Sequence, residues 1–505
     1  MRKVKSMLGV TIVLGLLIIQ MALGVSSDVG KSQAVLDWQV DYSSEDGSDS
    51  YIPSTILTDK KGDVYLSGHQ RVLSPVHPYF PIEYYPSLIK LDDDGNQLWK
   101  INLKDEDSHM SVIFVDTDEH NNLYVGLTNR LSGRVNIKKY NKTGNLIWED
   151  SFTDEGQAGM SISVKIKIGR KGNVYISQSY LNISRERLSP MDLPGTMVEH
   201  VFTKISADGD IEWQAVQDAP SLGKHMTMIG FHPINSFKVD HWGNVVTALS
   251  DNGGVRLTKY DADGNVLWED VFEEEERDFF LFGMAMGKNG AVYLSITEYS
   301  NSIPYPGSLD LGFTLRPKGS LVIVTNSFVV KYEADGELGF ISDQDLVYQG
   351  RLMIDRSDNV YIAGTTELLD FRRSDCEVQK LDADGILQWS HFLTDLQAPI
   401  FGSLSSYSVD LDEQNGSLYI ISEDYTGPRM LRKINSDGQL CYEQELERPD
   451  CLSDRSCAHS SLRVVKDNNK GIYVLGRPFL FSSNGGVTGI TLSRFVEENV
   501  KGKDR

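Results

Sequence analysis

The chain of 505 residues carries 71 acidic and 49 basic side chains, which give a formal net charge of −22 at pH 7. This charge argues against nucleic acid as a partner, because binding to phosphates requires a basic surface. The length suits one large domain or two ordinary ones, and the repeats described below favour one.

The first predicted element is a secretory signal peptide. Arg2, Lys3 and Lys5 precede an apolar stretch over residues 7–23, and small residues follow it. We therefore expect a signal peptide over residues 1–24, a secreted protein that is extracellular or periplasmic, and no membrane span in the mature chain. An uncleaved anchor is the alternative, because the apolar stretch is close to the length of a membrane span.

A short pattern then recurs along the chain, with a glycine four positions before an aromatic residue. The seven pairs are Gly95 and Trp99, Gly144 and Trp148, Gly209 and Trp213, Gly264 and Trp268, Gly336 and Phe340, Gly385 and Trp389, and Gly438 and Tyr442. Each copy is expected to form a β-hairpin whose Asp-x-Asp-Gly-Asn turn uses the positive φ of glycine. The aromatic residue is expected to fill space between neighbouring sheets. A platform for a cofactor or a sugar is the alternative.

A second recurring element precedes each hairpin and consists of an Asp or Gly, a short turn and a Val-Tyr-type strand. Its eight copies span residues 59–68, 118–127, 169–177, 240–248, 287–295, 355–364, 412–421 and 467–476. Each repeat thus supplies four antiparallel strands, named a to d in chain order. Radial repetition of such units is typical of a β-propeller.

The two ends of the chain complete each other. The eighth unit stops after a strand c at residues 490–496, whereas residues 35–40 contain Trp38 in a strand that has no repeat of its own. Pairing the two would remove exposed sheet edges. We therefore expect an all-β, eight-bladed propeller of four-stranded antiparallel blades over residues 32–497, closed by the N-terminal strand, with a charged tail over residues 498–505.

The repeats also resemble a known group. Lys-Tyr-Asp-x-Asp-Gly-Asn-x-x-Trp is similar to the tryptophan-docking repeat of pyrroloquinoline-quinone-type eight-bladed propellers, and Asp-x-x-Gly-Asn-Val-Tyr-x-x-Gly resembles bacterial propeller repeats of the NHL type. The quinone-binding dehydrogenases of that family hold their cofactor against a vicinal disulfide, and no two cysteines here are adjacent. The resemblance therefore implies the non-enzymatic branch, whose exported scaffold propellers dock peptides or proteins, and no cofactor.

Four cysteines lie in the last third of the chain: Cys376, Cys441, Cys451 and Cys457. In an exported protein an even number suggests disulfide bonds, and four cysteines allow three connectivities. Cys451 and Cys457 are the closest pair and could bridge a single loop. Their spacing is not that of a zinc site.

Strand direction sorts the connections onto two faces. Turns a–b and c–d lie on one, the short-turn face, and loops b–c and d–a on the other, the long-loop face. The long insertions, residues 71–87, 181–200, 216–236 and 298–327, all belong to the long-loop face. Because binding residues concentrate where loops grow on a rigid scaffold, we expect the site there.

The candidate ligand-binding residues lie in or beside these insertions. They are His69, His77, Tyr79, Tyr84, Tyr85, Arg185, Arg187, His225 and His232. The tyrosines suit stacking or apolar contact, and the arginines suit a carboxylate or sulfate. A lid packed on neighbouring blades and surface salt bridges are the alternatives. The spacing of the histidines indicates no metal site.

The sequence thus predicts a binding or scaffold protein that recognises a protein, peptide or glycan through the long-loop face. The alternative is an extracellular hydrolase or lyase, acting on a polysaccharide or sulfated ligand, with a site at the channel mouth on the same face. The catalytic residues of such an enzyme are unknown, because no nucleophile elbow or phosphate loop is present. An enzyme would bring titratable groups with shifted pKa values together in one pocket.

Overall fold

The computed structural model describes 32 β-strands and most of the turns between them. The described residues are 32–42, 49–73, 81–104, 110–129, 134–152, 160–169, 171–181, 198–219, 235–251, 253–274, 277–303, 321–342, 346–365, 376–393, 406–423, 429–446, 461–467, 471–477 and 491–499. They contain no helix, and thus no helix that could cross a membrane. The predicted signal peptide lies outside them.

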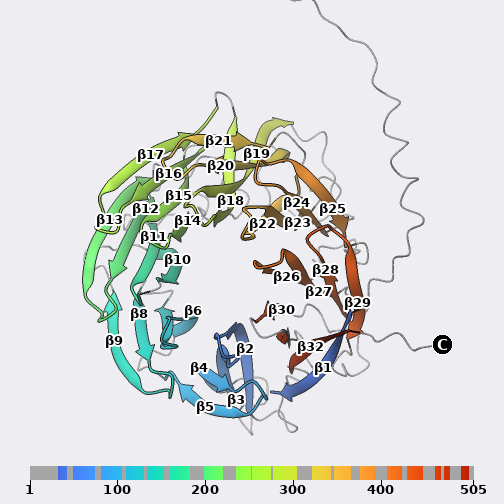
Figure 1. The fold of residues 1–505 in the computed structure, drawn as a ribbon. Coiled ribbons are helices and arrows are strands. Elements are labelled where there is room, and N and C mark those ends of the chain that lie inside the picture. Colours follow the sequence, from blue (N-terminus) through green and yellow to red (C-terminus); the bar gives the residue numbers. More distant parts are fainter. Residues whose placement is uncertain are drawn as a thin grey trace, which may run out of the picture.

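The strands form eight four-stranded antiparallel sheets arranged radially as the blades of a propeller (Figure 1), as the sequence predicted. The innermost strands are β2 (Asp49–Thr58), β6 (Met110–Thr117), β10 (Met160–Ile168), β14 (Asn235–Val239), β18 (Asp278–Met286), β22 (Tyr348–Ile354), β26 (Ser406–Asp412) and β30 (Ser461–Lys466). The second strands are β3 (Val64–Leu73), β7 (Leu123–Asn129), β11 (Val174–Leu181), β15 (Val245–Asp251), β19 (Val292–Ile303), β23 (Val360–Thr365), β27 (Ser417–Glu423) and β31 (Gly471–Arg477).

The outer half of each blade holds the other two strands. The third strands are β4 (Pro81–Leu91), β8 (Val135–Tyr140), β12 (Val198–Ile205), β16 (Gly254–Tyr260), β20 (Leu321–Tyr332), β24 (Cys376–Leu381), β28 (Arg429–Ile434) and β32 (Thr491–Asn499). The outermost strands are β5 (Gln97–Asn102), β9 (Leu146–Phe152), β13 (Ile211–Ala219), β17 (Val266–Phe272), β21 (Leu338–Ile341), β25 (Leu387–Phe392), β29 (Leu440–Leu446) and β1 (Ser32–Asp41). Blades are numbered 1 to 8 from β2, so blade 8 consists of β30, β31, β32 and β1.

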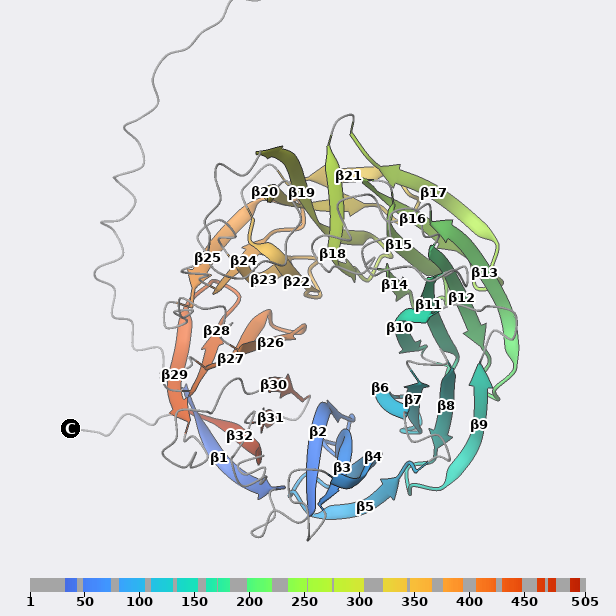
Figure 2. The same ribbon diagram turned by 180° about the vertical axis from the view of Figure 1, so that it is seen from behind.

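Blade 8 confirms the predicted closure. The N-terminal strand β1 pairs antiparallel with β32, with Val35 opposite Val496 and Val40 opposite Leu492. In both views β1 continues the outer rim between β29 and β5 (Figures 1 and 2). The two ends of the chain therefore share one sheet, and no blade edge is left open at the seam.

The repeated aromatic residue docks each blade on the next. Trp213 of blade 3 donates a hydrogen bond from Nε1 to the Ala262 carbonyl of blade 4, at 3.1 Å, and covers Gly264. Gly264 has a φ of 88°, and a Cβ built there would lie 2.7 Å from the indole. Glycine is thus required both for the turn and for the close approach of the ring.

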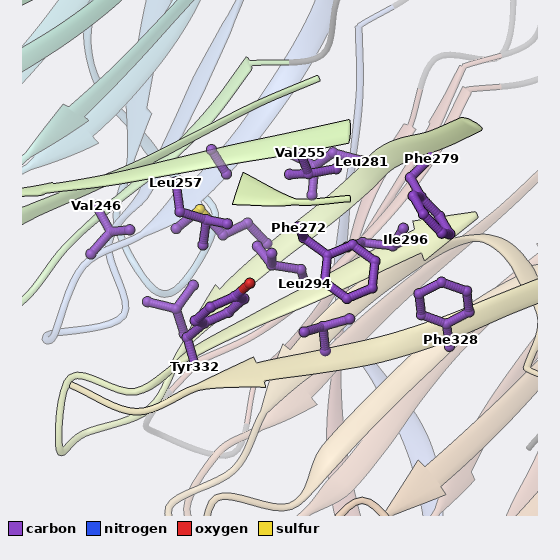
Figure 3. Close-up of a cluster of buried hydrophobic side chains, with 14 residues drawn as sticks. Val246, Val255, Leu257, Phe272, Phe279, Leu281, Leu294, Ile296, Phe328 and Tyr332 are labelled. Carbon is purple, nitrogen blue, oxygen red and sulfur yellow. The ribbon is translucent and has the colours of Figure 1, made fainter. Parts of the chain in front are cut away.

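Apolar side chains fill the spaces between adjacent blades. Between blades 4 and 5, the rings of Phe272, Phe279 and Phe328 pack edge to face or tilted, with centroids 5.1 to 5.8 Å apart (Figure 3). Leu257 and Leu294 complete this cluster and are fully buried. The blades are therefore joined mainly by side-chain packing, which fixes their innermost strands around the axis.

Two of the predicted long loops are shorter than expected, because their ends continue the sheet. In blade 1 the ladder between β3 and β4 extends to Arg71 opposite Tyr84 and Val72 opposite Glu83. In blade 5, β19 and β20 pair as far as Ile303 opposite Leu321. Backbone groups in these segments gain ladder hydrogen bonds, which offset the cost of leaving them in an open loop.

Candidate functional site in the central channel

The innermost strands carry one position that sets the chemistry of the channel. It lies two residues before the Asp or Gly that begins each a–b turn. In blade order it is occupied by Leu57, Asp116, Lys167, Lys238, Ala285, Met353, Asp410 and Val465. The apolar members show where the side chain points, since Ala285 packs in a cluster with blade 6 and Met353 in one with blade 7. The same direction takes Lys167 towards blade 4 and Lys238 towards blade 5.

The two aspartates at this position have a structural role. Asp410 Oδ2 accepts a hydrogen bond from the Lys466 backbone N–H of the next blade at 2.7 Å. Asp116 likewise accepts one from the backbone N–H of Ile168. Burial raises the pKa of both carboxyl groups, although these hydrogen bonds act against the shift. Each carboxyl group therefore satisfies a backbone donor on an inner sheet edge.

The two lysines instead border a cavity of about 560 Å³, lined by blades 3 to 7. Lys167 and Lys238 reach it from β10 and β14, and Arg351 reaches it from β22. The Arg351 guanidinium also donates a hydrogen bond to the Val409 carbonyl at 3.0 Å. The cavity exists partly because its wall in blade 5 contains small residues, Ala285 and Gly287.

The electrostatics of Lys238 are unusual for an acidic protein. Burial lowers its pKa to about 8, and the positive charges of Lys167, Lys165 and Arg351 add to the shift. No described residue forms a hydrogen bond or ion pair with its ammonium group. A lysine with this pKa is partly neutral near pH 8, so it can accept a proton.

The mouth of the cavity lies on the short-turn face. His241, Lys288 and Glu413 of the a–b turns line it. Trp242, next to His241, has 61% of its surface exposed, and the two rings are in contact with centroids 3.3 Å apart. An aromatic surface therefore lies beside a cavity that carries several positive charges.

Charge on this face changes with distance from the axis. The exposed side chains of the described a–b turns are more often basic than acidic: Lys60, Lys61, Lys171, Lys288 and Arg356 against Glu119 and Glu413. The exposed side chains of the outer c–d turns are mostly acidic: Asp93, Asp94, Asp208, Asp210, Asp263, Asp335, Glu337, Asp384 and Asp437 against Lys142. This pattern directs an anion towards the axis and repels it from the rim.

Of the residues that the sequence singled out, the three that the structure describes, His69, Tyr84 and Tyr85, are not among those that line this cavity. His69 lies on β3, with Tyr84 and Tyr85 on the paired strand β4 of blade 1, towards the long-loop face. The Lys104 ammonium lies 4.5 Å from the centre of the Tyr85 ring. His77, Tyr79, Arg185, Arg187, His225 and His232 lie outside the described residues. A ligand site on the long-loop face therefore stays a prediction.

The sequence did not single out Lys167, Lys238, Arg351, His241 or Trp242. The repeats hold a partial signal for two of them. Four of the eight blades carry a charged residue at this inner-strand position, and it is a lysine in the two adjacent blades 3 and 4, at Lys167 and Lys238.

A second pair of side chains has the composition of a nucleophile and its base. Ser179 Oγ lies 2.8 Å from His200 Nδ1, between β11 and β12. Burial and the charge of Arg256 lower the pKa of His200 to about 4, so the imidazole is neutral. Ser179 is fully buried, however, which keeps a substrate away from its hydroxyl. We interpret the pair as structural.

None of the described residues that line the cavity is a cysteine. Cys441 is a free thiol on β29, and the predicted pairing of Cys451 with Cys457 falls outside the described residues. Among the described residues no group of three His, Cys, Asp or Glu side chains is placed to hold a metal ion.

Comparison with known proteins places the chain in no family. No family model and no curated protein matches it. Similar solved structures include prolyl oligopeptidase B from Galerina marginata, a post-proline cleaving enzyme from Rickettsia typhi and puromycin hydrolase, at 9, 10 and 8% identity with TM-scores of 0.42, 0.41 and 0.40. They align with 86, 85 and 86% of this chain, which spans only 55, 58 and 60% of theirs.

The main functional hypothesis was a binding or scaffold protein that acts through the long-loop face, and these matches do not support it, because the printed descriptions are of peptidases and a hydrolase. Similarity at this level identifies neither a substrate nor a mechanism. Among the described residues, the structure gathers titratable groups in the channel at the short-turn face.

Proposed function

We propose that the protein is an enzyme that breaks a bond in an anionic substrate bound in the central channel, entered from the short-turn face. One observation carries the proposal: Lys167, Lys238 and Arg351, from three different blades, border one cavity in a protein of net charge −22. Lys238 is half-buried, and the charges of Lys167 and Arg351 act against its own, although Asp240, Asp410 and Glu413 also line the cavity. A substrate anion would relieve this repulsion, and its binding energy would be largest where the cations converge.

Elimination next to a carboxylate suits these groups better than hydrolysis. Among the described residues that line the cavity there is no Ser, Thr or Cys to act as a covalent nucleophile, and the carboxylates of Asp240 and Asp410 already accept hydrogen bonds from backbone N–H groups. Lys238 can instead act as a general base, and Lys167 and Arg351 can neutralise the carboxylate whose charge increases as the neighbouring proton leaves.

The step balances without a co-reactant. Neutral Lys238 Nζ takes the proton from the carbon next to the carboxylate, and the electron pair of that C–H bond forms a C=C bond. The bond between the β carbon and its oxygen substituent breaks, and the oxygen leaves with the electron pair. The new Lys238 ammonium then returns the proton to the leaving oxygen.

We also propose that the protein is exported, on the strength of the basic and apolar pattern at its N-terminus. Sequencing the N-terminus of protein collected from the medium or periplasm tests this directly. A first residue near position 25 is expected, and material that begins at Met1 would contradict cleavage.

The enzymatic proposal is tested with uronate-containing polymers as substrates, by following the ultraviolet absorbance of an unsaturated product alongside the release of reducing ends. Lys238→Met should lower kcat by about 10²-fold or more, the usual contribution of a general base. Lys167→Met should mainly raise KM. Lys142→Met, which removes an exposed cation from an outer hairpin, is the matched control and should change neither constant.

Three results would decide against the proposal as stated. Reducing ends without absorbance would show hydrolysis instead of elimination. An unchanged kcat in Lys238→Met would show that Lys238 is not the general base. Sulfate or a carboxylate should raise the melting temperature of the wild type more than that of Lys238→Met. If neither does, the cavity is not an anion site.

A further inference from the structure

Trp242 departs from the pattern of the other tryptophans. Six of the seven tryptophans lie on outermost strands, where the described rings dock on the next blade, as Trp213 does on Gly264. Trp242 lies instead on an inner turn, between β14 and β15, and is 61% exposed. It therefore contributes nothing to the docking that joins the blades.

The equivalent positions of other blades are polar. They are occupied by Lys61, His120, Lys171, Asn289, Ser357 and Gln414. The a–b turn itself accepts any of these side chains, so the fold does not require an aromatic residue there. The exposed tryptophan in the turn that follows Lys238 is therefore explained better by a function than by the fold.

The turn holds Trp242 in a fixed position. Asp240 Oδ1 accepts hydrogen bonds from the backbone N–H groups of Trp242, at 2.9 Å, and of Asn244, at 2.8 Å. The Asn244 side chain donates to Asp240 Oδ2 at 2.8 Å. With its backbone fixed and its ring against His241, the indole loses little conformational freedom when a ligand stacks on it.

The chemistry of the indole and of the cavity points to one ligand class. The face of an indole carries negative quadrupole charge and an apolar surface, which attract the C–H face of a sugar ring. Lys238 and Lys167 attract carboxylates. A pyranose ring that bears a carboxylate satisfies both surfaces at adjacent sites.

We propose that Trp242 is a stacking platform for a sugar ring and that the substrate is an acidic oligosaccharide whose uronate carboxylate enters the cation-lined cavity; this rests on the function proposed above. The acidic outer turns oppose a polyanion laid across the whole face. A chain end or a short oligosaccharide therefore enters along the axis, and the enzyme acts from the end of the polymer.

Calorimetric titration of the full-length mature protein tests the platform with three ligands of equal charge. They are a hexauronate, a sulfated hexasaccharide and a hexaglutamate peptide. The hexauronate should bind the wild type, and Trp242→Ala should weaken binding about tenfold or more, by analogy with the loss of an aromatic side chain that stacks on a nucleic-acid base. Hexaglutamate should bind more weakly and should be unaffected by Trp242→Ala.

Leu267→Ala is the control variant, because Leu267 is a half-exposed apolar residue on β17 of the same blade. It should leave all three affinities unchanged. If Trp242→Ala binds hexauronate as the wild type does, the platform is wrong while the anion site survives. If the sulfated sugar alone binds, the carboxylate assignment is wrong. If no ligand binds at all, the proposed function fails together with this inference.

Discussion

The indole N–H of Trp38 donates a hydrogen bond to the main-chain carbonyl of Asp93 at 2.7 Å, and the indole covers Gly95. This contact joins blade 8 to blade 1 in the way that Trp213 joins blade 3 to blade 4. The other side of blade 8 is built differently. There the Lys433 ammonium pairs with the Glu497 carboxylate at 2.8 Å, in place of a c–d hairpin. The N-terminal strand thus carries a contact on which closure of the ring depends.

We predict that Trp38→Ala lowers the free energy of unfolding by about 2–4 kcal/mol, since it removes a large, partly buried aromatic side chain. Urea unfolding monitored by circular dichroism measures the change. Trp242→Ala removes the same side chain from an exposed turn and should shift stability by less than about 0.5 kcal/mol. Equal effects of the two substitutions would show that the contact of Trp38 does not support closure.

Glycine at the hairpin turns should matter for two separable reasons. Gly264 and Gly209 both have positive φ, 88° and 105°. A Cβ at Gly264 would lie 2.7 Å from Trp213, whereas one at Gly209 would lie 3.6 Å from Trp148. Gly209→Ala should therefore cost only the backbone strain, about 1–2 kcal/mol.

For Gly264→Ala we expect the same strain and, in addition, displacement of the Trp213 ring, for a total of about 2–4 kcal/mol. Thermal unfolding of the two variants compares them directly. A crystal structure of Gly264→Ala should show the ring displaced from the hairpin. Equal melting temperatures would mean that the ring moves aside at no cost.

The sequence predicted the blades well because the packing repeats. Every hairpin uses the same turn and takes part in the same kind of docking contact: Gly264 receives Trp213 of the preceding blade, and Trp268 covers Gly336 of the next, so the signal recurs at a fixed spacing. Closure by Trp38 was predictable for the same reason, since it completes a count that is otherwise short by one.

The channel site could not be predicted in the same way, because a site is where a repeat breaks its pattern. Lys238 lies in a strand whose spacing is that of any inner strand, and its charge is informative only once Lys167 and Arg351 are known to face the same cavity. Three residues from separate blades meet there by the curvature of the ring. The long insertions in the sequence instead indicated the opposite face.

The titration of Lys238 makes stability depend on pH. Its pKa is about 8 in the folded protein against 10.5 in the unfolded chain. Below pH 8 both states are charged, so the folded state bears the full cost of the buried ammonium. As pH rises from about 8 to 10.5, only the unfolded state stays protonated, and the cost is relieved. The positive charge on Lys238 is opposed by those of Lys165, Lys167 and Arg351. The other titratable residues that line the cavity are Asp240, His241, Lys288, Asp410 and Glu413.

Lys238→Met should therefore be more stable than the wild type at pH 7 by about 1 kcal/mol, after allowance for partial solvent access, and this advantage should disappear near pH 10.5. Chemical unfolding at a series of pH values measures the difference, from which groups shared by the two proteins cancel. Lys142→Met should show no such trend. A constant difference across this range would contradict the low pKa of Lys238.

The last prediction separates the channel from the buried Ser179 and His200 pair. Ser179→Ala leaves His200 Nδ1 without its partner at 2.8 Å, which should cost about 1–3 kcal/mol of stability. Because Ser179 is fully buried, kcat and KM on a uronate polymer should stay at their wild-type values below the melting temperature. Lys238→Met should show the reverse, with stability slightly raised at pH 7 and turnover lost. Loss of turnover in folded Ser179→Ala would move the chemistry out of the channel and into blade 3, with the serine as nucleophile and His200 as its base.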